Sequence, residues 1–315
     1  MRITIPENEI VFGAGASSLN ALISLQLQLS IMTRSLNDKY PKAVVDNVES
    51  FEYTIVKRMI IALDTFLSIC IVQRDYDSAA GIVRSIADKG CALALIYKCE
   101  DSLEKEYRHY LFVLDGLRER RSLLREHIEY NGRISREEFE ALTIQMDNAR
   151  QDTDNAIAFV EDKLNSHSYA SNYPIFHNAV VKQAEWKFSN VGVLSNKGKV
   201  ISKTWKELYS LIDSRPDIIS MYSSYLSQFV HGLSFSIALE HCSFDNFESL
   251  ISVGICLQGF IRNILIQDFD GERQMKDNFT LNDLHLIFPL FGEEKRAEMF
   301  SKIQEILNNP RADEK

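Results

Sequence analysis

The side chains best suited to proton transfer are a serine and a histidine in a long uncharged segment. Residues 218–239 form a run of 22 without Asp, Glu, Lys or Arg, and their apolar periodicity predicts a helix. Ser227 and His231 are four residues apart, so on a helix the hydroxyl lies within reach of the imidazole. His231 could then act as a general acid or base. Alternatively, Ser227 or a neighbouring helix satisfies a purely structural histidine.

Arg84 and Asp88, also four residues apart, form a second pair. Small and apolar residues surround them, so we expect a partly buried ion pair, in which the guanidinium either stabilises phosphate charge or braces two helices. We predict that their helix packs against the helix of Ser227 and His231, since both are poor in charge. These four residues, Arg84, Asp88, Ser227 and His231, are the candidate catalytic cluster.

The order of these motifs resembles an uncharacterised family of bacterial helical proteins, whose members have an RxxxE helix and a later YxxLSxxxH helix. Here the first motif is Arg84-Ser-Ile-Ala-Asp88, and the later one is Tyr222-x-x-Tyr-Leu-Ser-x-x-x-His231. The segment Tyr107-Arg-His-Tyr lies between them. The resemblance covers about residues 60–263 and implies a helical fold without an established activity. Asp88 replaces the Glu of the family, which shortens its reach across the bundle.

The chain also resembles, more distantly, HEPN domains, helical bundles often found in RNases of toxin and phage-defence systems. Their signature places an arginine shortly before a histidine, which only Arg121 and His127 match here. The nearest arginine before His231 is the distant Arg215. This resemblance implies an alternative function, a metal-independent RNase in which His231 is the acid or base and Arg84 stabilises phosphate charge.

Composition restricts the other classes of function. The net charge of −9 argues against general polyanion binding. The sequence contains no HExxH motif, Walker A loop or GxGxxG motif, so we expect neither a metal nor a cofactor. The five cysteines are scattered and form no CxxC pair, which indicates free thiols in a reducing compartment. The acidic N-terminus is unlike a signal peptide, so we predict a cytoplasmic protein.

Few helix breakers, 13 glycines and 6 prolines, predict an all-α multi-helix bundle forming a single domain over residues 1–315. We expect no sheet beyond one short hairpin near residues 191–201. The uncharged runs 10–33 and 218–239 are long enough to cross a membrane. Their polar residues, including Gln26 and Gln228, favour burial within the bundle instead.

Residues 100–165 differ from the rest, because 19 of the residues from 100 to 140 are charged. Asn131 and Gly132 supply a turn, and Ser135 with Glu138 fits a helix-capping box. We predict a charged helical hairpin here, followed by an irregular connector over residues 166–202. Such a hairpin is either a solvated element or an arm that binds a partner.

We therefore expect a helical binding or regulatory protein, within a bacterial defence or stress locus. The charged hairpin is its candidate surface for a protein partner, and self-association into a homo-oligomer is left open. RNA is a ligand only under the nuclease alternative, and no membrane association is expected.

Overall fold

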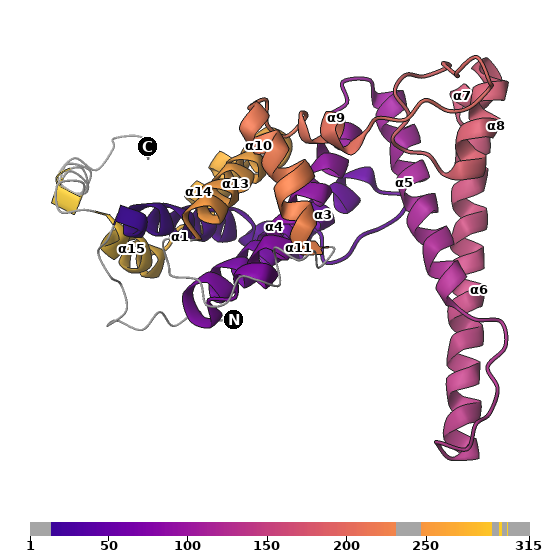
Figure 1. Cartoon of the computed structure of the whole chain (residues 1–315), viewed down its shortest axis with the longest axis horizontal. Coiled ribbons are helices and arrows are strands. Elements are labelled where there is room, and N and C mark those ends of the chain that lie inside the picture. Colours follow the sequence, from indigo (N-terminus) through magenta and orange to yellow (C-terminus); the bar gives the residue numbers. More distant parts are fainter. Residues whose placement is uncertain (1–13, 231–246, 292–295, 298–300, 302–315) are drawn as a thin grey trace, which may run out of the picture. The chain divides into compact units, whose positions relative to one another are not determined.

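The computed structural model describes residues 14–230, 247–291, 296, 297 and 301 (Figure 1). Every named element in these residues is helical, so the predicted all-α class is confirmed. Seven of the described helices are longer than eight residues. The β-type pairing within the described residues consists of two isolated antiparallel bridges, Phe188 with Ser202 and Leu194 with Val200. They lie where we expected a short hairpin.

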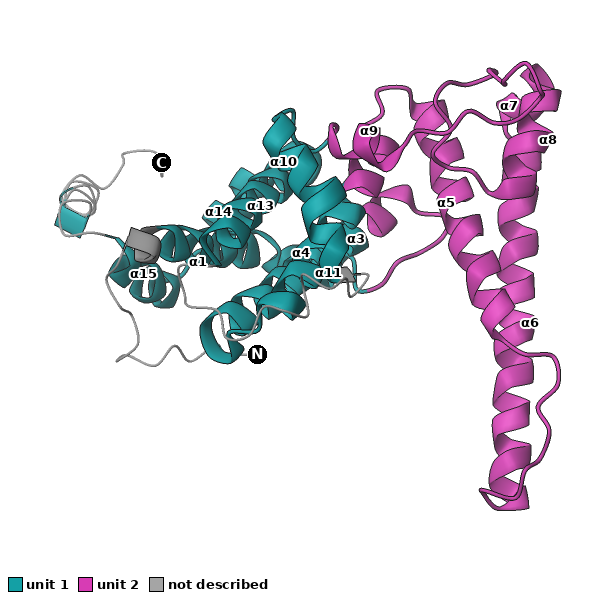
Figure 2. Cartoon of the chain, in the orientation of Figure 1, with its two compact units in different colours: residues 1–41, 53–90, 212–315 teal, residues 42–52, 91–211 magenta. Residues whose placement is uncertain are grey.

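The chain forms two compact units, coloured separately in Figure 2. Unit 1 comprises residues 1–41, 53–90 and 212–315, and unit 2 comprises residues 42–52 and 91–211. The single domain expected from the sequence stays a prediction. Two boundaries fall inside helices α3 (Val48–Ser68) and α4 (Tyr76–Ala92). The helical periodicity therefore continues through both boundaries, and no linker composition marks them.

In unit 1, α1 (Ala14–Met32) packs against α13 (Glu248–Phe269) and α14 (Gly271–Asn278). Gly254 lets α13 approach closely, because a Cβ there would lie 2.9 Å from Phe66 and 3.1 Å from Leu22. Within the described residues, α13 is the one helix long and apolar enough to cross a membrane, and half of its most apolar stretch is buried in the structure. Besides most of α3 and α4, the other helices described in this unit are α2 (Arg34–Lys39), α10 (Pro216–Ser220), α11 (Leu226–Val230) and α15 (Leu281–Ile287). The described residues also include π-helical segments at Ile69–Gln73 and Met221–Tyr225 and a 3-10 turn at Phe288–Leu290.

A polar network crosses the apolar core of unit 1. The Gln26 side-chain amide donates to the Ile60 carbonyl at 3.0 Å and to the Asp64 carboxylate at 2.7 Å. The Gln258 amide donates to the Leu22 carbonyl at 2.9 Å and to Gln26 Oε1 at 3.1 Å. Burial raises the pKa of Asp64. Gln26, which lies inside the run 10–33, therefore forms its hydrogen bonds with neighbouring helices, as burial of a polar side chain in a core requires.

Unit 2 is built around a hairpin of α5 (Ser102–Leu123) and α6 (Arg136–Ser166). Asp101 caps α5, and the predicted capping box of Ser135 and Glu138 begins α6. The two helices run antiparallel, because Arg118 pairs with Glu161 and Arg121 with Asp154, both at 2.7 Å. The predicted charged hairpin is therefore confirmed. A π-helical segment, Leu93–Tyr97, precedes α5, and the short helix α9 (Trp205–Tyr209) lies near the end of the unit.

The expected irregular connector is partly helical. It contains α7 (Ser168–Asn172) and α8 (Pro174–Gln183), and becomes irregular only from Ala184. Pro174 does not break a helix here, since it occupies the first turn, where a missing N–H costs no hydrogen bond. Ala184 ends α8 in the left-handed conformation, with φ of 48°, so no glycine marks the helix end in the sequence.

Candidate functional site

Arg84 and Asp88 form the expected ion pair on α4, with Arg84 Nε 2.9 Å from Asp88 Oδ1. The arginine side chain is 14% exposed and the aspartate 36%. Arg84 Nη1 also donates to the Tyr222 carbonyl at 2.5 Å. The guanidinium therefore joins α4 to the helical run that contains Tyr222.

The Tyr222 carbonyl accepts this bond where the helix is widened. Met221–Tyr225 is π-helical, and the Leu226 N–H donates to the Met221 carbonyl, five residues back. In a regular α-helix the same N–H would bond to Tyr222 instead. The widening therefore directs the Leu226 N–H away from the Tyr222 carbonyl, and the Arg84 guanidinium donates to that carbonyl. Such π-bulges are frequent at functional sites.

A second contact joins the same two helices. The Tyr76 hydroxyl on α4 lies 2.7 Å from the Tyr225 hydroxyl, and the Tyr76 ring packs on Phe229, with centroids 5.4 Å apart. The helix of Arg84 thus contacts the helix of Ser227, as predicted. Ser227 is half-buried on α11. His231 lies outside the described residues, so the Ser227–His231 pair and the shared catalytic cluster stay predictions.

The described part of this cluster is suited to bracing helices. The Arg84 guanidinium donates to Asp88 and to a backbone carbonyl, an arrangement that holds two helices together. Across the part of the chain that the structure describes, no three His, Cys, Asp or Glu side chains form a group that could hold a metal ion. In the HEPN-like pair, Arg121 binds Asp154, while His127 is exposed in the loop after α5.

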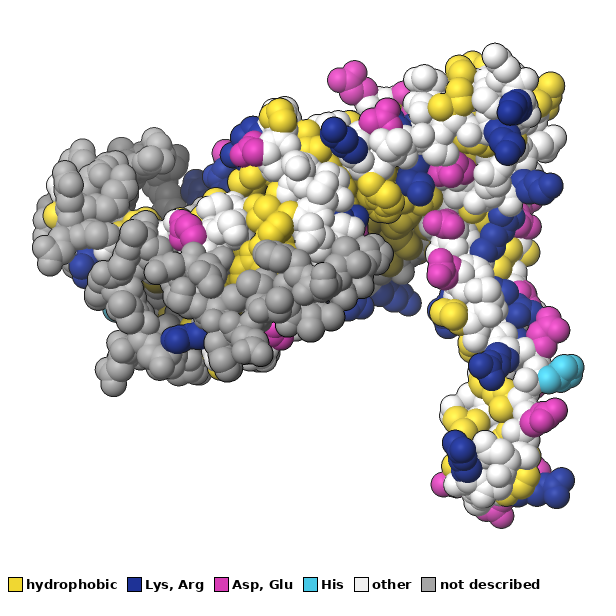
Figure 3. Space-filling view, viewed as in Figure 1, with side chains coloured by type: hydrophobic (Ala, Val, Ile, Leu, Met, Phe, Trp, Pro, Cys, Tyr) yellow, Lys and Arg dark blue, Asp and Glu magenta, His cyan; other side chains and the backbone are white. Residues whose placement is uncertain are grey.

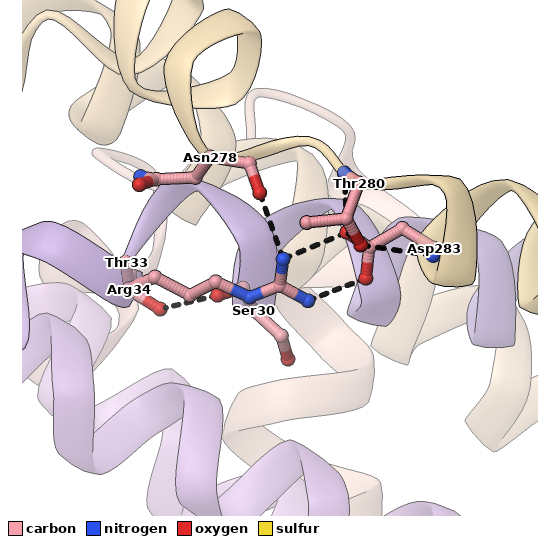
Figure 4. Close-up of polar contacts among 6 residues, drawn as sticks. All are labelled: Ser30, Thr33, Arg34, Asn278, Thr280 and Asp283. Carbon is pink, nitrogen blue, oxygen red and sulfur yellow. Dashed lines mark hydrogen bonds and ion pairs between the residues drawn. The ribbon is translucent and has the colours of Figure 1, made fainter.

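An arginine clamp fixes the start of α15 to α2 (Figure 4). Arg34 Nη1 donates to the Asn278 carbonyl at 2.8 Å and to Asp283 Oδ2 at 2.7 Å, and Nη2 donates to Asp283 Oδ1. Asp283 Oδ2 also accepts from the Thr280 N–H and hydroxyl, at 2.8 and 2.7 Å. The Arg34 bond, followed by the Thr280 bonds, lowers the pKa of this buried carboxyl to about 2.

Unit 2 contains buried histidines that the sequence interpretation missed. His109 is fully buried; its Nε2 donates to the Val45 carbonyl at 2.8 Å, so Nδ1 accepts from the Tyr97 hydroxyl at 3.0 Å. His177 Nε2 donates to Asn165 Oδ1 at 3.2 Å, so Nδ1 accepts from the Tyr107 hydroxyl at 2.9 Å. The motif Tyr107-Arg-His-Tyr, which carries part of the family resemblance, supplies His109 and also Tyr107, the partner of His177.

His167 follows the same pattern at the junction of α6 and α7. Its Nδ1 accepts from the Tyr169 N–H at 3.2 Å, and its Nε2 donates to the Leu103 carbonyl at 3.1 Å. Burial lowers the pKa of His109, His167 and His177. Each imidazole uses one nitrogen as donor and the other as acceptor, a role open only to the neutral ring. These residues are therefore structural cross-braces.

Arg108, the neighbour of His109, is also buried, with 1% exposure. It bonds Glu104 through Nε at 2.7 Å, donates to the Trp186 carbonyl at 2.7 Å and covers the Phe188 ring at 3.6 Å. Burial lowers its pKa, against the opposing effect of Glu104. Its donors are directed at protein groups, which assigns it a structural role as well.

The free end of the hairpin has a different character. Arg121, near the end of α5, pairs with Asp154, whereas α6 begins at Arg136. Residues 136–150 of α6 therefore extend beyond α5 (Figure 1). We call residues 118–152 the arm, and the non-helical residues 124–135 the strap.

The strap covers only part of this end of α6. The Tyr130 ring packs edge-on against Phe139, with centroids 5.2 Å apart, and Arg150 donates to the Glu126 carbonyl at 3.0 Å. Apolar side chains remain exposed, and Figure 3 shows several of them gathered at the free end of the arm. They are Leu123 (75% exposed), Ile128 (42%), Tyr130 (49%), Ile134 (37%), Leu142 (48%) and Ile144 (60%).

No protein-family model, curated protein or solved structure matches the chain. The two family resemblances drawn from the motifs therefore stay predictions, and function is argued from the described residues themselves.

Proposed function

We propose that this protein binds another protein chain through the arm. The observation that carries the proposal is the length of α6 beyond the end of α5, residues 136–150, which is about four helical turns. Over these turns, the described residues that cover α6 are those of the strap. An extended segment buries less of a helix than a second helix does.

Helix energetics support a missing partner. Residues 136–150 are the first part of the 31-residue helix α6, and most helical stability in proteins comes from packing an apolar face. Leu142 and Ile144, on the uncovered turns, are 48% and 60% exposed. Because they are two residues apart, they lie on opposite sides of the helix. A partner that covers either side chain would gain apolar burial and would stabilise the end of α6.

The charge of the arm favours a protein over a nucleic acid. Residues 118–152 contain seven arginines and eight Asp or Glu residues, so the arm has almost no net charge. Nucleic-acid binding needs an excess of basic side chains to neutralise phosphates. Mixed charges around exposed apolar residues are typical of protein interfaces.

The nuclease alternative has weaker support. It requires Arg84 to meet phosphate, whereas the Arg84 guanidinium donates to Asp88 and to the Tyr222 carbonyl. Its acid or base, His231, lies outside the described residues.

Site-specific crosslinking in cells tests the proposal. A photo-crosslinking amino acid replaces Ile144 on the arm or, as the control, Ile175 on α8, which is 75% exposed in the same unit. We expect a discrete protein adduct from position 144 and none from position 175. Absence of an adduct at 144, or the same adducts at both positions, would contradict the proposal.

A further inference from the structure

A second surface of unit 2 is formed by residues 186–206, which we call the lysine surface and which share no residue with the arm. They contain five lysines and no acidic residue, in a chain of net charge −9. The lysines are Lys187, Lys197, Lys199, Lys203 and Lys206. The flanking carboxylates bond to other donors. Glu185 accepts from the Lys187 N–H at 3.1 Å, and Glu207 accepts from the Thr204 N–H and hydroxyl, both at 2.7 Å.

Backbone pairing places two of these lysines opposite each other. Phe188 and Ser202 form an antiparallel bridge, and the Lys203 N–H donates to the Lys187 carbonyl at 2.8 Å. Phe188 is fully buried, so the alternation of strand side chains directs Lys187 and Lys203 to the outer face, where both are partly exposed. Like charges directly opposite destabilise a strand pair. A bound anion would relieve this repulsion.

Trp205 supplies an exposed aromatic ring beside these lysines. It is 42% exposed, and Lys187 Nζ lies 5.5 Å from its ring centroid. Thr204 caps α9 and makes Trp205 its first residue, and the indole stacks on the fully buried Tyr209, with centroids 6.0 Å apart. The indole is therefore held against the protein. The flexible stem of Lys187 allows its ammonium group to turn from the ring to a ligand.

We infer that the lysine surface binds single-stranded nucleic acid, with a base stacked on Trp205 and the phosphates bound by the lysines around it. Proteins bind single strands by combining basic grooves with aromatic rings, since every base presents a π-face. A duplex keeps its bases paired and offers the lysines only phosphates. An acidic peptide has no base to stack, and an indole stacked on Tyr209 does not project as a membrane anchor would. The inference goes beyond the proposed function and does not depend on it.

Another exposed aromatic ring in unit 2 provides a matched control. Phe159 on α6 is 40% exposed, and Lys163 Nζ lies 5.3 Å from its ring centroid. Lys163, however, pairs with Asp46 at 2.7 Å. Its charge is matched within the protein, so we expect no nucleic acid to bind at Phe159.

Fluorescence anisotropy gives the first test. The full chain is titrated into a labelled single-stranded oligothymidylate of about 12 nucleotides, and into its duplex with oligoadenylate. We expect tighter binding of the single strand. Trp205→Ala should raise the Kd at least about fivefold, because it removes the stacked base, whereas Phe159→Ala should leave the Kd unchanged.

Salt dependence tests the lysines. Each phosphate contact to a single strand contributes about 0.7 to the slope of log K against log salt concentration. Lys199→Gln combined with Lys203→Gln should therefore reduce the magnitude of this slope by about 1.4. Lys42→Gln combined with Lys276→Gln removes the same charge at two exposed positions outside the lysine surface and should leave the slope unchanged.

Tryptophan fluorescence reports stacking in a folded protein. The chain has two tryptophans, and Trp186 is only 7% exposed. The oligonucleotide should quench the wild type through Trp205. Trp205→Phe keeps a ring at this position, so it should retain most of the affinity and lose most of the quenching.

Absence of binding at low salt, binding of the duplex as tight as that of the single strand, or equal losses in the matched controls would each overturn the inference. Binding of phosphatidylserine vesicles in place of the oligonucleotide would also overturn it, and would assign the lysine surface to a membrane.

Discussion

Arg34 and Asp283 are 249 positions apart, yet the guanidinium of one binds both carboxylate oxygens of the other. Asp283 is also the third residue of the α15 capping box, so one buried carboxylate both begins a helix and ties it to α2. The Arg34 side chain is 43% exposed, so the buried carboxylate is the more sensitive partner.

We predict that Asp283→Asn lowers the free energy of unfolding of unit 1 by about 1–3 kcal/mol, since it weakens a charge-assisted bond at a buried site. The folded pKa is lowered from 3.8 to about 2, so below 3.8 the unfolded chain binds more protons. The contribution is therefore complete above 3.8 and is lost as pH falls towards about 2. Urea unfolding across this range should show the wild type and the variant converging in acid.

The control for this prediction is Asp277→Asn. Asp277 pairs with Arg273 at 3.4 Å, but both side chains are more than half exposed. We expect a change of under about 1 kcal/mol. Equal losses in the two variants would show that the clamp adds nothing beyond an exposed ion pair.

The histidine cross-braces predict that unit 2 loses stability in mild acid. Burial lowers the folded pKa of His109, His167 and His177 below the ordinary 6.5, so below 6.5 the unfolded chain takes up protons first. Their contribution is complete above 6.5 and is lost as pH falls through the folded values. The protection factors of α5 amides, which correct for the intrinsic pH dependence of exchange, should fall over this range, while a flat profile would contradict the assignment.

His177→Gln replaces one histidine brace with a side chain that does not titrate. The Gln amide can accept from the Tyr107 hydroxyl and donate to Asn165, whose Oδ1 lies 3.2 Å from His177 Nε2. We expect a shallower dependence of stability on pH in this variant at little cost near neutral pH.

Arg84 should matter more than its ion-pair partner. We predict that Arg84→Met lowers the free energy of unfolding by about 1–3 kcal/mol, because it removes the donor to the Tyr222 carbonyl at the helix widening. Asp88→Asn should cost under about 1 kcal/mol, since Asp88 is 36% exposed. Chemical denaturation measures the loss in free energy of unfolding for each variant. A larger loss for Asp88→Asn than for Arg84→Met would place the bracing role on the ion pair.

What the sequence predicts correctly is what local patterns determine. The capping box of Ser135 and Glu138 uses residues three apart and forms as expected. The helix over Pro174–Gln183 was missed because Pro174 has opposite meanings in the first turn and in the interior of a helix.

Long-range features were not available from such patterns. The widened helix at Met221–Tyr225 is bonded by Arg84, 138 positions away, and neither segment alone predicts the other. The exposed end of α6 also depends on a relationship between separate segments, here the lengths of α5 and α6. Its periodicity predicts a helix, but only the structure shows that α5 ends near Asp154 and leaves residues 136–150 to the strap.

The most direct test of the arm as a binding element compares hydrogen exchange of residues 139–150 in the free chain and in the adduct crosslinked to its partner through position 144. Residues 156–164, which pack beside α5 in the same helix, provide an internal reference. We predict that protection of residues 139–150 is higher in the adduct than in the free chain, while residues 156–164 remain unchanged. Equal protection of residues 139–150 in the adduct and in the free chain would contradict the account.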